Sequence, residues 1–148
     1  MKIQILTAAI SSLLVAASTY AAGDLSRANP EKIVIEMGTQ GTQMYFKPNH
    51  LDLETGKAYK LVLKNVDKVK HELDPGEFGA KIFTRKVEVV HDGQMLAEIK
   101  GSLREIEVGP GGEVEWLIVP VQTGKDLDFE CALKGHREAG MTGTVTIN

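Results

Sequence analysis

The feature that most constrains the fold is a series of short segments in which apolar and polar residues alternate, each ended by turn residues. Alternation with a period of two is typical of strands that bury one face. In residues 113–119, for example, Val114, Trp116 and Ile118 fall on one side. We therefore expect an all-β fold, a Greek-key β-sandwich. The predicted strands cover residues 32–37, 42–47, 51–54, 59–64, 87–90, 94–100, 104–108, 113–119, 128–132 and 142–147.

Two connections between these segments carry specific predictions. Asp92-Gly93 separates two strand-like segments and predicts a hairpin, because both residue types tolerate the positive φ of a tight turn. Residues 74–86 show no alternation, and Phe78, Ile82 and Phe83 are spaced loosely like one face of a helix. We therefore expect a longer loop or a short helix of one or two turns in this segment.

Length and charge limit the class of protein. The chain has 148 residues, which suits one domain, expected here over residues 23–148. Lys and Arg total 17 against 20 Asp and Glu, a net charge of −3, and the two signs are scattered. Because nucleic-acid binders carry a basic patch, we expect no nucleic-acid partner. The chain contains no G-x-S-x-G, H-E-x-x-H, phosphate-loop or dinucleotide motif, which favours a protein that is not an enzyme.

The first 22 residues predict a secretory signal peptide. Lys2 precedes an uncharged stretch over residues 3–20 that is rich in Ala, Leu and Ser, and Ala21 and Ala22 follow as small residues. A retained membrane anchor is the alternative, but the small residues favour cleavage. We therefore expect an exported, periplasmic monomer that keeps no membrane span after cleavage.

Cys131 is the single cysteine of the chain, although exported domains usually carry cysteines in pairs. A lone thiol in an oxidising compartment is a liability unless it is buried, paired with another chain or bound to metal. A buried core cysteine is the simplest alternative. However, the loop that starts at Cys131 also contains His136 and Met141, and His71 follows a strand 60 residues upstream.

These four residues together predict a copper site. Two imidazoles and one thiolate, with a weak thioether on the axis, form the trigonal donor set of blue copper centres. Soft sulfur favours Cu(I), while imidazole accommodates both oxidation states. A single Met is more often a core residue, and a single loop His is more often solvated. The combination of all four, in order and beside strands, favours the metal site.

Several short motifs accompany the four residues. They are Phe46-x-Pro48, Leu51-x-Leu53, His71-Glu72-Leu73, Pro110-Gly111-Gly112, Phe129-x-Cys131, Gly135-His136 and Gly140-Met141-x-Gly143. With the C-x₄-H-x₄-M spacing, they resemble the cupredoxins, the type 1 blue copper proteins such as plastocyanin, azurin and rusticyanin, over residues 32–148. The resemblance implies a cupredoxin-like sandwich that holds one type 1 copper ion as its cofactor. It also implies His71, Cys131 and His136 as equatorial ligands and Met141 as the axial ligand.

Other residues are expected to support the predicted site. Asn65 and the residue after His71 would hold the ligands in place, with backbone groups bonded to the cysteine sulfur. Phe129 would face the same side as the cysteine two positions later and cover the copper. His91 and Met95 flank the predicted hairpin and would offer a weak second copper contact. The favoured alternative is an exposed His and a half-buried Met, because two ligands do not make a dedicated site.

Two functions follow from the resemblance. The main prediction is a soluble carrier of single electrons between redox proteins, such as a cytochrome or a membrane oxidase or reductase. The alternative is a periplasmic copper-handling protein that carries or stores copper or confers resistance to it. A subunit that docks on a larger membrane oxidase or reductase, and a sandwich that binds no metal, are further alternatives.

Overall fold

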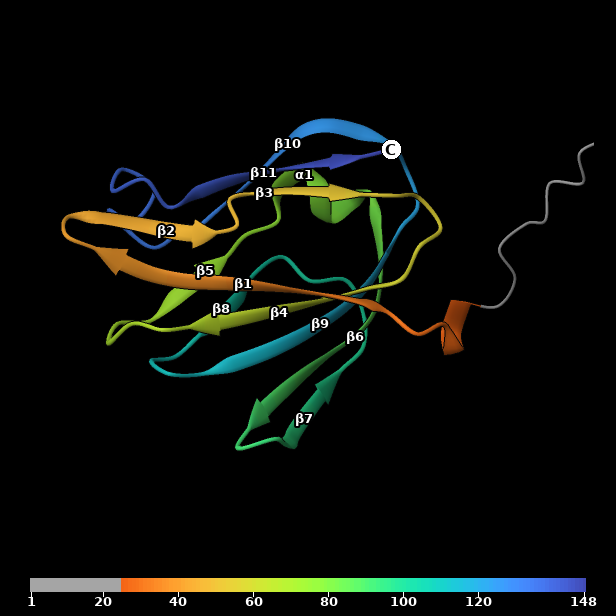
Figure 1. The fold of residues 1–148 in the computed structure, drawn as a ribbon, viewed down its shortest axis with the longest axis horizontal. Coiled ribbons are helices and arrows are strands. Elements are labelled where there is room, and N and C mark those ends of the chain that lie inside the picture. The colour runs from red at the N-terminus through yellow and green to blue at the C-terminus, as the bar shows by residue number, and fades with distance from the viewer. Residues whose placement is uncertain (1–24) are drawn as a thin grey trace, which may run out of the picture.

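The computed structural model describes residues 25–148, so the predicted signal peptide over residues 1–22 lies outside the described residues. A short 3₁₀ turn, η1, spans Leu25–Arg27, and the helix α1 spans Gly76–Ala80. Within this described part, no helix is long and apolar enough to cross a membrane. The strands (Figure 1) are β1 (Glu31–Gln40), β2 (Gln43–Lys47), β3 (His50–Leu53), β4 (Tyr59–Asn65), β5 (His71–Leu73), β6 (Ile82–His91), β7 (Gln94–Ile99), β8 (Ile106–Val108), β9 (Glu113–Pro120), β10 (Gly124–Glu130) and β11 (Thr142–Ile147).

The strands form two main layers, as Figure 1 shows. One layer is a six-stranded sheet in the order β2-β1-β4-β9-β6-β7, and the other is a three-stranded sheet in the order β10-β11-β3. The short strands β5 and β8 pair with each other. Two pairings, β1 with β4 and β11 with β3, are parallel, and parallel neighbours need a crossover connection rather than a hairpin. The predicted β-sandwich is confirmed.

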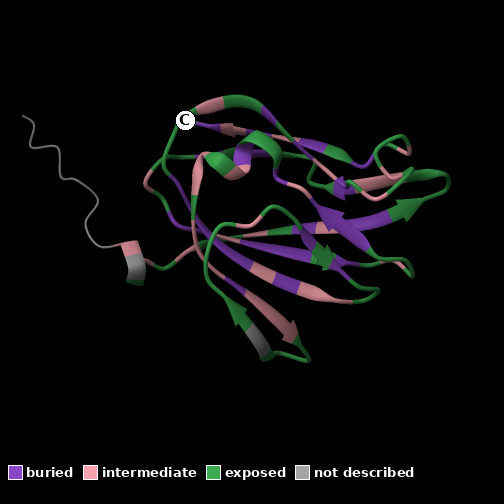
Figure 2. Cartoon of the chain, turned by 180° about the vertical axis from the view of Figure 1, so that it is seen from behind, coloured by how far each residue is buried: buried purple, intermediate pink, exposed green. Residues whose placement is uncertain are grey.

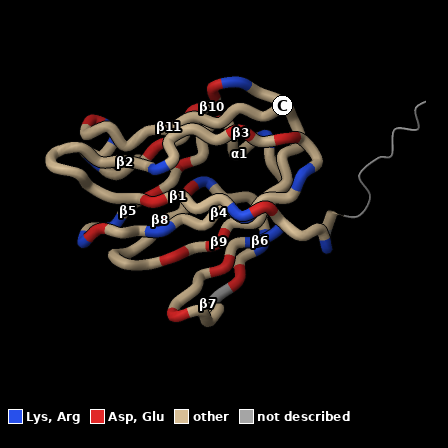
Figure 3. Tube along the Cα trace, in the orientation of Figure 1, with Lys and Arg blue, Asp and Glu red and all other residues tan. Residues whose placement is uncertain are grey.

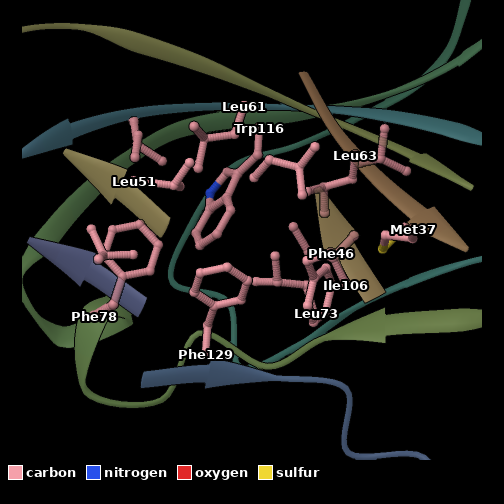
Figure 4. Packing of buried hydrophobic residues seen from close by; sticks show 14 of the residues in the cluster. Met37, Phe46, Leu51, Leu61, Leu63, Leu73, Phe78, Ile106, Trp116 and Phe129 are labelled. Carbon is pink, nitrogen blue, oxygen red and sulfur yellow. The ribbon is translucent and has the colours of Figure 1, made fainter. Parts of the chain in front are cut away.

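The core lies between the layers and is centred on Trp116 (Figure 4). Its indole is 1% exposed, its Nε1–H donates to Thr84 Oγ1 at 3.1 Å, and it meets the Phe78 ring edge-on at 5.8 Å between centroids. Phe46 and Phe129 form a second edge-on pair at 5.0 Å. These rings join β2, β9, β10 and α1, and Figure 2 shows buried residues on strands of both layers.

Most of the predicted strands are present, although some bounds differ: β10 spans Gly124–Glu130 where the pattern predicts 128–132. The hairpin at Asp92-Gly93 forms between β6 and β7, with φ of 49° and 75° at these residues. The segment over residues 74–86 contains the expected short helix. The prediction that the rest of this segment, up to residue 86, is a loop is wrong. β6 already begins at Ile82, because residues 82–90 pair with β9. The sequence does not predict β5, whose three residues are too few for an alternating pattern and depend on pairing with β8.

Charged residues of both signs are interspersed along the described chain (Figure 3). Lys86 Nζ lies 2.7 Å from Glu88 Oε1 and 3.2 Å from Glu98 Oε2, and Lys60 Nζ lies 2.6 Å from Glu115 Oε2. Two of these pairs join neighbouring strands of the six-stranded sheet. The absence of a nucleic-acid partner stays a prediction.

We expect Gly143→Ala to lower the free energy of unfolding by about 1–3 kcal/mol, the usual cost of overpacking. Gly143 lies opposite Phe129 in the β10–β11 pairing. An added Cβ would enter the Phe129 ring and lie 2.7 Å from the carbonyl oxygen of Asn49. Urea denaturation of the metal-free protein measures the change.

Gly109→Ala is the matched control for this substitution. Gly109 is exposed, and a Cβ built on it meets no heavy atom within 4 Å. The urea concentration at which half of the control protein is unfolded is expected to be close to that of the parent protein. Equal midpoints for both variants and the parent would show that the ring of Phe129 does not occupy the space above Gly143.

Candidate metal centre

A short antiparallel contact brings the His71 segment to the end of β10. Asp74 and Glu130 exchange two backbone hydrogen bonds, with N–O distances of 2.8 and 3.0 Å. Cys131 directly follows Glu130, and its Sγ accepts a hydrogen bond at 3.3 Å from the N–H of Glu72, two residues before Asp74. Two segments that are 60 residues apart in the sequence therefore meet at the sulfur atom. The predicted backbone bond from the residue after His71 to the cysteine sulfur is confirmed.

The loop after Cys131 folds back on its own start. Met141 N–H donates to the His136 carbonyl at 3.0 Å, and Cys131 N–H donates to the Met141 carbonyl at 3.1 Å. Gly135 and Gly140 have φ of 88° and 99°, a region that glycine adopts without a Cβ clash. These turns place the backbone of Met141 against both other predicted ligands of the loop, and its side chain is fully buried.

Among the described residues, His71, Cys131 and His136 form a group of side chains that could hold a metal ion, with one donor atom of each within 4.8 Å of the others. His136 Nδ1 lies 3.3 Å from both His71 Nδ1 and Cys131 Sγ. The two imidazole rings meet edge-on, with centroids 5.1 Å apart. His71 and Cys131 are fully buried and His136 is half-buried, so the cluster reaches the surface through one ring.

The electrostatics of the cluster suit a bound cation. Burial raises the pKa of the Cys131 thiol, although the backbone N–H groups of Leu133 and Glu72 partly oppose this by stabilising the thiolate. Burial, followed by repulsion from His71, lowers the pKa of His136, which keeps a neutral imidazole available as a donor. A metal ion would supply the positive charge that a buried thiolate needs. Soft sulfur with two imidazoles is a donor set that fits copper.

Asp67 lies at the site, although the sequence pattern does not predict it. Its carboxylate Oδ2 lies 3.1 Å from Nε2 of His71, on the side of the ring away from the cluster. It also accepts hydrogen bonds from the Thr39 hydroxyl and, at 2.7 Å, from the Lys68 N–H. These two donors, with His71 as a further partner, hold the pKa of Asp67 below its ordinary value. The sequence shows only an acidic residue four positions before a predicted ligand. That spacing indicates a contact with the ligand only when the conformation of the loop is known.

Asn65 and Phe129 are both buried, and neither has a described hydrogen bond to the three donor atoms of the cluster. The Asn65 amide donates to the carbonyls of Val69 and Val108, both at 2.8 Å, and its Oδ1 accepts the Asp67 N–H at 2.9 Å. It therefore fixes the loop that leads to His71. Phe129 is 2% exposed and belongs to the core beside the end of β10. Its predicted role as a cover for the copper stays a prediction.

His91 and Met95 lie at the exposed tip of the β6–β7 hairpin. Met95 is 57% exposed, and the His91 side chain is 73% exposed and lies 3.5 Å from an Asp92 carboxylate oxygen. The metal-binding group described above does not include His91. A weak second copper contact at this hairpin stays a prediction.

Solved structures support the fold. The chain superposes on a copper nitrite reductase from Nitrosomonas europaea with a TM-score of 0.64 and 11% identity, covering 83% of this chain and 51% of that one. It superposes on a multicopper oxidase from Campylobacter jejuni with a TM-score of 0.60 and 16% identity, covering 80% of this chain and 30% of that one. The chain thus spans about half or less of these enzymes, and the likeness shows the cupredoxin-like fold.

Sequence comparisons identify relatives and a family. Copper-resistant cuproprotein CopI of Pseudomonas aeruginosa is 27% identical over 128 residues, covering 70% of this chain and 71% of the relative. CopI of Rubrivivax gelatinosus is 26% identical over 126 residues, covering 84% of this chain and 70% of the relative. Residues 33–148 match the family described as copper binding proteins, plastocyanin/azurin family. The chain therefore belongs to the plastocyanin/azurin family of copper-binding proteins, with a type 1 copper site.

Proposed function

We propose that His71, Cys131 and His136 are the equatorial ligands of one copper ion and that Met141 is its axial ligand. The three donor atoms within 4.8 Å support the equatorial set, and the backbone bonds of the ligand loop support Met141. When bound, copper supplies reversible one-electron chemistry and a strong bond to the thiolate. The residues of the chain hold these donor atoms close together, and burial shields all of them except His136 from water.

We propose further that this site serves copper handling in an exported protein that protects the cell from copper. The observation that carries the proposal is the buried thiol and imidazole cluster in a chain whose curated relatives are named copper-resistant cuproproteins. Electron transfer is the main prediction from the sequence, and copper handling is the alternative. The relatives support the alternative better. A protein that sequesters copper in this way would act in the periplasm, after removal of the predicted signal peptide.

Transfer of single electrons is the second candidate, and one observation favours it. His136 is half-buried, while His71 and Cys131 are fully buried, so one ligand ring provides a short route to the surface. A partner would be a redox protein such as a cytochrome or a membrane oxidase or reductase. Either function is binding or transfer rather than catalysis, because four protein ligands leave no open position for a substrate.

Expression of the full chain in a copper-sensitive bacterial strain is expected to raise the copper concentration that the cells tolerate. Cys131→Ser is expected to remove most of this protection, because a hydroxyl is a hard and weakly acidic replacement for the soft thiolate. The measurement is growth over a copper series, with the amount of exported protein checked in each strain.

His50→Ala is the matched control for this experiment. His50 lies on β3, outside the cluster, where its Nδ1 is 2.7 Å from Thr144 Oγ1. Cells that carry this variant are expected to tolerate as much copper as cells with the parent chain. Full protection by the Cys131→Ser variant would show that the protein does not act through this copper site.

The ease with which a chelator removes the bound copper and the rate of electron exchange separate the two candidate functions. Copper handling predicts Cu(I) that a competing chelator removes within the time of the assay, together with slow electron exchange with a soluble cytochrome. Electron transfer predicts one ion that survives the chelator and cycles reversibly between its oxidation states. Chelator competition and stopped-flow mixing with a cytochrome measure both properties on the same sample, and a tightly held, rapidly cycling ion would contradict the handling proposal.

A further inference from the structure

His71 has two ring nitrogens in two different environments. Its side chain is fully buried, so neither nitrogen can rely on bulk water for a hydrogen-bond partner. Nδ1 points toward the cluster, 3.3 Å from His136 Nδ1, and Nε2 lies 3.1 Å from Asp67 Oδ2. An ionised carboxylate can only accept a hydrogen bond, so Nε2 must carry the proton when the ring is neutral. That tautomer leaves the Nδ1 lone pair free for a metal ion.

Asp67 is itself held in place from several directions. Its Oδ2 accepts the hydroxyl of Thr39 on β1, its Oδ1 accepts the Lys68 N–H, and its own N–H donates to the Asn65 side chain. The side chain is 19% exposed, which partly shields it from water. The carboxylate is therefore a fixed group that ties a strand of the large sheet to the outer nitrogen of His71.

We propose that Asp67 is a positioning residue of the copper site that fixes the His71 tautomer and biases the bound ion toward Cu(II). The inference rests on the proposed ligand role of His71. A carboxylate behind a ligating imidazole orients the ring and raises its basicity. A negative charge close to the ion also favours the more highly charged oxidation state, and burial reduces the screening of that attraction.

Another carboxylate near the site provides a comparison. Glu107 lies on β8 and pairs with Lys70 at 2.9 Å, and its side chain is 48% exposed. It is one of the charges that raise the pKa of Cys131, yet it makes no described contact with His71. Glu107→Gln therefore removes a nearby negative charge without removing a hydrogen bond to the ligand. Asp67→Asn removes a charge from a group that does contact the ligand.

Two variants separate the hydrogen bond of Asp67 from its charge. Asp67→Asn keeps an oxygen that can accept the Nε2 proton, whereas Asp67→Ala removes it. In metal-free protein at neutral pH, nitrogen NMR of His71 is expected to show the Nε2–H tautomer in the parent and in Asp67→Asn, and a mixture in Asp67→Ala. The ratio of Cu(II) to Cu(I) affinity, measured with competing chelators, is expected to fall about tenfold in Asp67→Asn.

Glu107→Gln is expected to keep the parent tautomer and to change the affinity ratio much less than Asp67→Asn. The proposal is overturned if Asp67→Ala keeps a pure Nε2–H tautomer, or if Glu107→Gln changes the ratio as much as Asp67→Asn. Because Asp67→Asn preserves shape, it gives an answer even if the alanine variant does not fold. The NMR result does not require metal, so it tests positioning separately. Failure of the parent to bind copper would overturn both the proposed function and the oxidation-state part of this inference.

Discussion

The metal centre depends on the antiparallel contact between the His71 segment and the end of β10. Two backbone bonds between Asp74 and Glu130 align the segments, and the Glu72 N–H then reaches the sulfur of Cys131. Each such bond contributes only about 1 kcal/mol net, but together they fix which side chains face one another. The contact consists of bonds made by the chain itself, so the fold holds the donor atoms of His71 and Cys131 close to one another.

Burial shifts the pKa values of these donor groups. The Cys131 thiol is removed from water and has a raised pKa, while the lowered pKa of His136 keeps its ring neutral. A soft cation compensates the thiolate and uses the imidazole lone pairs, which is the donor preference of copper. The same donors suit storage of copper and transfer of an electron. The choice of copper handling therefore rests on the named relatives, while the half-buried ring of His136 keeps electron transfer as the second candidate.

The sequence predicts the features that depend on local pattern. Alternation around Trp116 identifies a central strand, and Asp92-Gly93 identifies the hairpin, because periodicity and turn chemistry are written into neighbouring residues. Family resemblance leads to the residues of the cluster. Pattern does not predict β5 or the first half of β6, whose pairing is set by distant strands. The pattern does not predict the role of Asp67 for the same reason. Its contacts with Thr39 and His71 depend on how the loop is placed against β1.

The central claim is that Cys131 bonds to copper between two imidazoles, and a spectrum tests it most directly. One equivalent of Cu(II) is added to the mature protein, and visible absorption and electron spin resonance are recorded on the same sample. A copper–thiolate bond at Cys131 predicts an intense thiolate-to-copper band with a narrow copper hyperfine splitting. A pale spectrum with a wide splitting would show copper bound without the thiolate, and it would contradict a copper–thiolate bond at Cys131.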